Sequence, residues 1–193
     1  MTVELTSTRG DVTVNLAYTF RPDDYKVGVV GSVSGVGPKG GLPLVGMGPG
    51  LANTEANLVE NERSMGFVTK SQGTKFKSFE SLDTAEVAAV SGPFEWVAVK
   101  SKYFVTAVLA FETGAAPVGG LSVRPMPQAG QKKAHLASIW ASLLLPAAGD
   151  FRYELYAGPM EYSRLAKVGH DFNDVNPYGW PGFRTIIRPV AVA

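Results

Sequence analysis

The sequence predicts a mainly β fold of the sandwich class, with a short helix near the C-terminal end. Three observations indicate this class: apolar and polar side chains alternate along several segments, the predicted strands follow one another at short intervals, and 22 glycines and 13 prolines supply many turns. A chain of 193 residues is long enough to bury one good core and short for two. We therefore expect residues 1–193 to form a single β-sandwich domain.

The clearest strand is predicted at residues 11–20, where the sequence is DVTVNLAYTF. Valine, leucine and aromatic side chains occupy every second position, and polar or small side chains occupy the positions between them. Such alternation is typical of a strand with one buried face. The turn-forming sequence RPDD follows, and the alternation resumes over residues 25–33, which predicts an antiparallel hairpin.

Shorter strands are predicted further along the chain. Residues 35–51 are dense in glycine and proline, which indicates loops or bulged edge segments. Residues 134–145 are compatible with a strand or a helix; we favour a strand, because a helix here would be apolar nearly all round. The other predicted strands are 65–69, 76–79, 86–90, 96–99, 103–111, 121–123 and 151–156.

One helix is predicted, at residues 159–168. Pro159 suits the first position of a helix, and Gly169 suits a left-handed C-terminal cap. Apolar residues recur at spacing three from Tyr162 to Val168. We expect this helix to pack on an edge of the sandwich.

The charge and the cysteine content exclude several classes of function. Eighteen basic and seventeen acidic residues leave a net charge of +1, which gives no field to attract nucleic acid. Without cysteine there is no disulfide framework, thiolate zinc site or thiol catalysis. The first residues do not resemble a signal peptide, and the apolar stretch 136–148 is too short to span a bilayer. We expect any export or membrane segment of the natural protein to lie outside these residues.

Two motifs suggest a bound cofactor or metal, and each has a simpler interpretation. Gly35, Gly37 and Gly40 match GxGxxG, but Pro38 lies inside the motif and no helix is predicted to follow, so we interpret it as a loop. The oxygen-rich residues 171–176 lack the glycine and glutamate of a calcium-binding EF-hand loop, which favours turn capping.

The sequence contains no recognisable catalytic motif. His135 and His170 lie far apart and outside any HExxH pattern, and no GxSxG elbow is present. His170 beside Asp171 is the remaining candidate for an oriented base. We predict that the chain is not an enzyme and has no catalytic residue, cofactor or metal.

Large aromatic side chains are numerous for a chain of this size. They are compatible with core packing, and also with a cleft that accepts an apolar chain or a peptide. The candidate cleft residues are Trp96, Tyr103, Phe104, Trp140 and Tyr156.

Two stretches carry a more specific pattern. Residues 94–111, FEWVAVKSKYFVTAVLAF, combine a Trp-Val-Ala start with a Tyr-Phe pair and an alternating strand. Further on, Tyr156 precedes a Gly-Pro pair at 158–159, and a Tyr-Gly-Trp element occupies 178–180. In order, spacing and residue type, these stretches resemble the large periplasmic domain of the YidC-type membrane-protein insertase family.

The resemblance implies a β-supersandwich of galactose mutarotase-like architecture, on the periplasmic side of the bacterial inner membrane and within a larger membrane protein. It implies a monomeric, non-catalytic module for interaction and positioning. Through the full-length insertase and chaperone, its partners would be membrane-protein substrates and accessory subunits of the Sec translocon. The alternative is a periplasmic carbohydrate-binding or mutarotase-like sandwich.

The resemblance also implies that the C-terminal end lies near the membrane surface. The candidate membrane or partner contacts are Tyr178, Gly179, Trp180, Phe183, Arg184, Ile186, Ile187 and Arg188.

Overall fold

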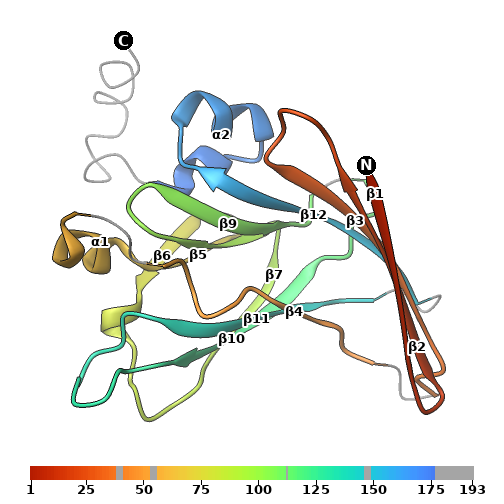
Figure 1. Ribbon diagram of the computed structural model, residues 1–193, viewed down its shortest axis with the longest axis horizontal. Coiled ribbons are helices and arrows are strands. Elements are labelled where there is room, and N and C mark those ends of the chain that lie inside the picture. The colour runs from red at the N-terminus through yellow and green to blue at the C-terminus, as the bar shows by residue number, and fades with distance from the viewer. Residues whose placement is uncertain (38–40, 53–55, 112, 146–148, 177–193) are drawn as a thin grey trace.

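Two antiparallel sheets of unequal width pack face to face in the computed structural model (Figure 1), which describes residues 1–37, 41–52, 56–111, 113–145 and 149–176. Within these residues the wide sheet has eight strands in the order β1 (Thr2–Arg9), β2 (Val12–Phe20), β3 (Lys26–Ser34), β12 (Asp150–Pro159), β9 (Phe104–Leu109), β8 (Trp96–Lys100), β5 (Gly66–Lys70) and β6 (Thr74–Ser78). The narrow sheet has four described strands in the order β4 (Leu44–Gly46), β11 (Ala137–Leu143), β10 (Val118–Pro125) and β7 (Ala88–Phe94). The predicted mainly β sandwich is confirmed.

Short helical elements lie at the margins of the two sheets. They are the helices α1 (Leu58–Ser64) and α2 (Tyr162–Val168) and the 3-10 turns η1 (Phe79–Ser81) and η2 (Phe172–Val175). In Figure 1, α2 lies beside the wide sheet on the side away from the narrow sheet. None of the helices in the described ranges is long and apolar enough to cross a membrane.

The wide sheet buries apolar side chains on both faces. Toward the narrow sheet, Val97 and Val108 pack in one core with Ile139 of β11. On the other face, Trp96 is fully buried beneath η2. The Trp96 ring meets Phe172 edge-on at a centroid distance of 5.1 Å, and its indole N–H donates to the His170 carbonyl at 3.0 Å. Alternation along each strand thus supplies two cores, one on each side of the wide sheet.

The predicted hairpin and the ambiguous segment both form strands. β2 pairs with β3 from Thr13 to Phe20, as the alternation predicts. Residues 137–143 form β11, which pairs with β10 on one side and β4 on the other, so the strand interpretation of 134–145 is confirmed. Among the described residues of the glycine-rich segment 35–51, only the short edge strand β4 is regular structure.

The predicted helix near the C-terminus is confirmed, but it begins three residues later than expected. Pro159 is the last residue of β12 and pairs with Phe104, so the helix starts at Tyr162. Gly169 follows the helix with φ of +86°, a conformation that favours glycine.

The strand β1 and the helix α1 are among the elements that were not predicted from the sequence. β1 is exposed along all eight residues, so burial imposes no marked alternation on its side chains. α1 is a capped single helix of seven residues: the Asn57 side chain accepts a hydrogen bond from the Glu60 backbone N–H at 3.1 Å.

Gly31 of β3 allows the wide sheet to bring Phe151 and Leu16 together. A methyl group on Gly31 would lie 2.7 Å from Phe151 Cε2 and 2.9 Å from Leu16 Cδ2. Gly31→Ala should therefore lower the free energy of unfolding by about 2 kcal/mol, measured by urea denaturation. Gly28→Ala in the same strand is the matched control, because its methyl group would meet only Thr19 Cβ at 3.9 Å. Equal effects of the two substitutions would show that close packing at Gly31 is not required.

Candidate functional site

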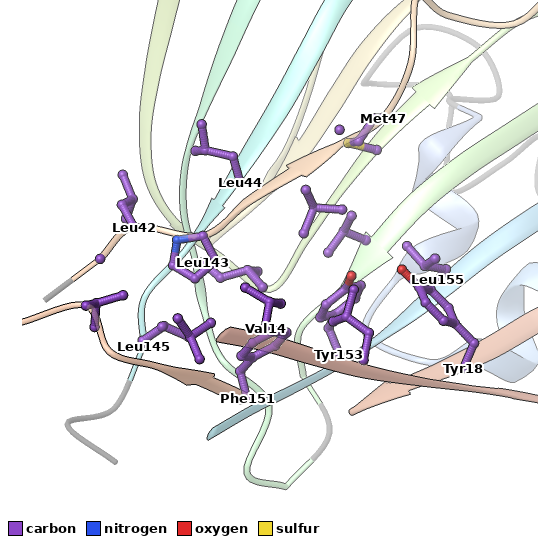
Figure 2. A pocket seen from close by; sticks show the side chains of 18 of the residues that line it. Val14, Tyr18, Leu42, Leu44, Met47, Leu143, Leu145, Phe151, Tyr153 and Leu155 are labelled. Atoms are coloured by element: carbon purple, nitrogen blue, oxygen red, sulfur yellow. The ribbon is translucent and has the colours of Figure 1, made fainter. Parts of the chain in front are cut away.

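A groove opens between the two sheets where the wide sheet extends past the edge of the narrow one (Figure 2). Its volume is about 580 Å³. One wall comes from β2 and β12 and includes Val14, Leu16, Tyr18, Phe151, Tyr153 and Leu155. The opposite wall comes from the segment around β4 and the end of β11, and includes Leu42, Leu44, Val45, Met47, Leu143 and Leu145. We call this site the inter-sheet groove.

The strand alternation that forms the sandwich also places the groove side chains. In β2, residues 14, 16 and 18 face the groove, and in β12 residues 151, 153 and 155 do so. Because the narrow sheet ends at β4, these side chains extend beyond its cover. β4 pairs with β11 on one side only, and the described residues supply no strand on its other side. An edge strand of this kind can accept an extended peptide by backbone hydrogen bonding.

The described residues give the groove an uncharged lining. None of the described residues that line it is acidic or basic, and its polar side chains are the hydroxyls of Thr106, Tyr18 and Tyr153. Desolvation, and secondarily the neighbouring Tyr18, raises the pKa of Tyr153 well above its usual value, so this phenol stays neutral. Figure 2 shows the hydroxyls of Tyr18 and Tyr153 on the same wall. The groove therefore suits an extended apolar chain with a few neutral hydrogen-bonding groups.

The five candidate cleft aromatics are not brought together. Trp96 and Tyr156 are fully buried under α2 and η2, so for these two rings core packing is the correct interpretation. Trp140 is exposed on β11, where its N–H donates to the Ser138 hydroxyl. Tyr103 and Phe104 are exposed at the turn between β8 and β9. None of the five lines the inter-sheet groove.

The candidate membrane contacts lie outside the described residues, which end at residue 176. They are Tyr178, Gly179, Trp180, Phe183, Arg184, Ile186, Ile187 and Arg188. They stay predictions.

The pairing of His170 with Asp171 is not observed. His170 Nδ1 lies 2.8 Å from Glu95 Oε2 on the surface, and the Asp171 carboxylate instead pairs with Lys70 at 2.9 Å. His135 lies 3.5 Å from Glu80 and 3.7 Å from Glu62 (Nδ1 to carboxylate oxygen). Across the part of the chain that the structure describes, no group of three or more such side chains is arranged to hold a metal ion.

The GxGxxG match also forms no nucleotide site in the described residues. Gly35 and Gly37 have φ of +76° and +69° and belong to an irregular segment after β3. Gly40 lies outside the described residues.

Comparison with known proteins decides between the alternatives for this sandwich. A family model described as the YidC periplasmic domain matches residues 1–192. The chain belongs to this family. The resemblance of residues 94–111 and 156–180 to the YidC periplasmic domain is therefore confirmed.

Curated relatives agree with the family match. Proteins named membrane protein insertase YidC are 27% identical in Chlorobium luteolum (86% of this chain, 29% of the relative) and 28% identical in Chlorobium phaeovibrioides (91% and 31%). A third, from a Geobacter species, is 26% identical (97% and 34%). The chain thus spans about a third of the length of the YidC proteins that it matches.

This member of the YidC periplasmic domain family contains a second pocket that the sequence analysis missed. It has a volume of about 570 Å³ and lies at the end of β8, and we call it the Lys100 pocket. Its lining residues include Ser64, Lys100, Lys102, Tyr103, Met160 and Asn176. The available signal was the alternation of β8, which places Lys100 on the same face as Trp96 and Ala98.

Lys100 is a buried cation in this pocket. It is only 6% exposed, and its ammonium donates one hydrogen bond, to the Ser64 carbonyl at 3.1 Å. The ammonium also lies 5.1 Å from the centroid of the Phe76 ring. Burial lowers the pKa of Lys100 to about 8 from its ordinary value of 10.5, because the charged form loses solvation.

The lowered pKa makes stability depend on pH in a defined window. Between pH 8 and 10.5 the folded chain holds fewer protons on Lys100 than the unfolded chain, so the free energy of unfolding should rise with pH there. Lys100→Met should remove this rise. At pH 7 it should also stabilise the fold by about 2 kcal/mol, since loss of the Ser64 hydrogen bond offsets part of the relieved desolvation.

The measurement is urea unfolding from pH 7 to 11, with Lys75→Met as the control. Lys75 is an exposed lysine on β6, in the same sheet. A variant with Met at position 100 that keeps the parental pH dependence would contradict the assignment of this titration to Lys100.

Proposed function

We propose that this chain is the non-catalytic interaction and positioning module of a membrane-protein insertase, on the periplasmic side of the inner membrane. Its proposed task is to hold an extended apolar stretch of a client membrane protein in the inter-sheet groove while the client is inserted and folded. The observation that carries the proposal is a groove whose described lining is uncharged, beside an edge of β4 that no described strand pairs with, in a chain of the YidC periplasmic domain family.

The chemistry of the groove supports an apolar client. Burial of apolar side chains contributes roughly 25 cal/mol for each Å² removed from water, whereas an unpaired charge would be strongly disfavoured against these walls. The free edge of β4 supports an extended conformation, because it offers backbone groups at the strand spacing. A transmembrane segment before insertion supplies both apolar side chains and unpaired backbone groups.

Two further parts of the proposal concern the full-length protein. We propose that accessory subunits of the Sec translocon bind the module while it works as a monomer. We also propose that residues 178–188 contact the membrane surface. The curated relatives carry the name membrane protein insertase, which supports a role beside a membrane.

Leu44→Asp tests the groove directly. Leu44 lines the groove and is 54% exposed, so the substitution should leave the fold intact and place a carboxylate among apolar walls. We expect the affinity for a dye-labelled peptide from a client transmembrane segment to fall by about tenfold, because the carboxylate would be desolvated on binding. Fluorescence anisotropy in mild detergent measures the affinity.

Leu58→Asp is the matched control. Leu58 is 53% exposed, lies at the start of α1 and does not line the groove, and a helix N-terminus tolerates an acidic side chain. This variant should bind the peptide within about twofold of the parent chain, as is usual for surface substitutions away from a site. Equal losses in the two variants, or no peptide binding by the parent chain, would refute the groove as the client site.

A further inference from the structure

The Lys100 pocket contains a positive charge that no described group neutralises. Lys100 forms no ion pair with any carboxylate in the described residues, and two of its three ammonium hydrogens have no protein acceptor there. An ammonium this deeply buried is stable only at a cost of several kcal/mol unless it gains a partner. A bound anion would supply that partner.

The other charged groups at the pocket are already balanced. Lys102 Nζ lies 2.8 Å from Glu60 Oε1, and this carboxylate raises the pKa of Lys102 to about 12. Glu161 accepts a hydrogen bond from the Ser163 hydroxyl at 2.7 Å and lies 3.5 Å from Arg164 Nε. These contacts lower the pKa of Glu161, with the Ser163 bond as the main cause. Lys100 is therefore the charge that would attract a ligand.

Exposed apolar side chains lie on two elements that contribute to the pocket, the β8–β9 turn through Tyr103 and α1 through its last residue, Ser64. Tyr103, in the turn after β8, and Phe104, at the start of β9, are 48% and 50% exposed. Leu58 and Val59 on α1 are also exposed. The turn is fixed to α1, because the Lys102 backbone N–H donates to Asn61 Oδ1 at 2.9 Å and the Lys102 ammonium pairs with Glu60. Exposed aromatic and aliphatic side chains beside lysines are typical of a surface that contacts the interface of a bilayer.

We propose that the Lys100 pocket binds the phosphodiester group of an anionic phospholipid, while Tyr103, Phe104, Leu58 and Val59 lie at the headgroup and acyl boundary. This inference rests on the proposed function, which places the module beside the membrane. Lysine binds phosphate as a point charge, and the lining residues Tyr103 and Asn176 have a hydroxyl and an amide that can act as neutral donors.

The Lys100 pocket lies where the described part of the chain ends. Asn176 is the last described residue and lines the pocket, so a lipid bound there would hold this point of the chain at the membrane surface. Residues 177–193 continue from that point. The headgroup contact would therefore fix the distance between the module and the bilayer independently of the inter-sheet groove.

Vesicle flotation tests the proposal with the whole chain. Vesicles of phosphatidylcholine containing about 30 mol% phosphatidylglycerol should bind the parent chain, and pure phosphatidylcholine vesicles should bind it weakly. Lys100→Met should weaken binding to the anionic vesicles by about fivefold, the loss expected for one lysine at the membrane surface. Tyr103→Ser with Phe104→Ser should weaken it as well.

Arg9→Met is the control for net charge, because Arg9 is exposed at the end of β1, where β1 turns into β2, and does not line the Lys100 pocket. It should bind anionic vesicles like the parent chain. Equal losses for Lys100→Met and Arg9→Met would show a diffuse charge effect and overturn the proposal. So would equal binding of the parent chain to both kinds of vesicle.

Inorganic phosphate distinguishes a lipid from a free anion. We expect about 10 mM phosphate to compete only weakly for the Lys100 pocket, because it lacks the apolar contacts of the lipid. If phosphate shifts the NMR signal of the Lys100 side chain while no vesicle floats the parent chain, the lipid assignment is overturned. Peptide affinity of the inter-sheet groove is measured on the same variants, and Lys100→Met should leave it unchanged. If the parent chain bound neither the anionic vesicles nor the peptide, that result would instead count against the proposed function.

Discussion

Strand β12 joins the two parts of the wide sheet, and the rest of the structure depends on its pairing. It pairs with β3 from Asp150 to Tyr156 and with β9 from Glu154 to Pro159, so the strands of the first 34 residues join the sheet through it. A salt bridge of 3.0 Å between Lys26 and Glu154 links β3 to β12. Alternate side chains of β12 enter the inter-sheet groove and the core beneath α2, because successive residues of a strand point to opposite faces.

The unequal width of the two sheets produces the groove, since four strands cannot cover the inner face of eight. Apolar walls left open to solvent, such as those at Leu42 and Leu44, contribute less to folding than buried ones and often mark interaction sites. The buried ammonium of Lys100 is a second departure from what stability alone favours. The exposed apolar walls and the buried ammonium both make the fold less stable than it could be. Such departures from maximum stability are expected at functional sites.

The sequence predicted strands with one buried face and also β5 and β8, whose residues are buried throughout. In residues 137–143 alternate side chains are buried in the core, and in residues 12–20 the apolar face packs partly against the core and lines the groove. β1 was missed because both of its faces are exposed, and α1 because its signal is the Asn57 cap and not an apolar stripe. Alternation predicts on which face of a strand a side chain lies, but not whether another element packs over that face. It therefore could not distinguish the buried ring of Trp96 from the exposed ring of Trp140. The groove was missed for the same reason.

The central claim is that the inter-sheet groove holds the client chain. The most direct measurement is photo-crosslinking in the full-length insertase, with benzoylphenylalanine at Met47 inside the groove or at Val30 on the exposed face of β3. During synthesis of a membrane protein, we predict a crosslink to the nascent chain from position 47 and none from position 30. Crosslinks of equal yield from both positions, or none from position 47, would contradict the claim.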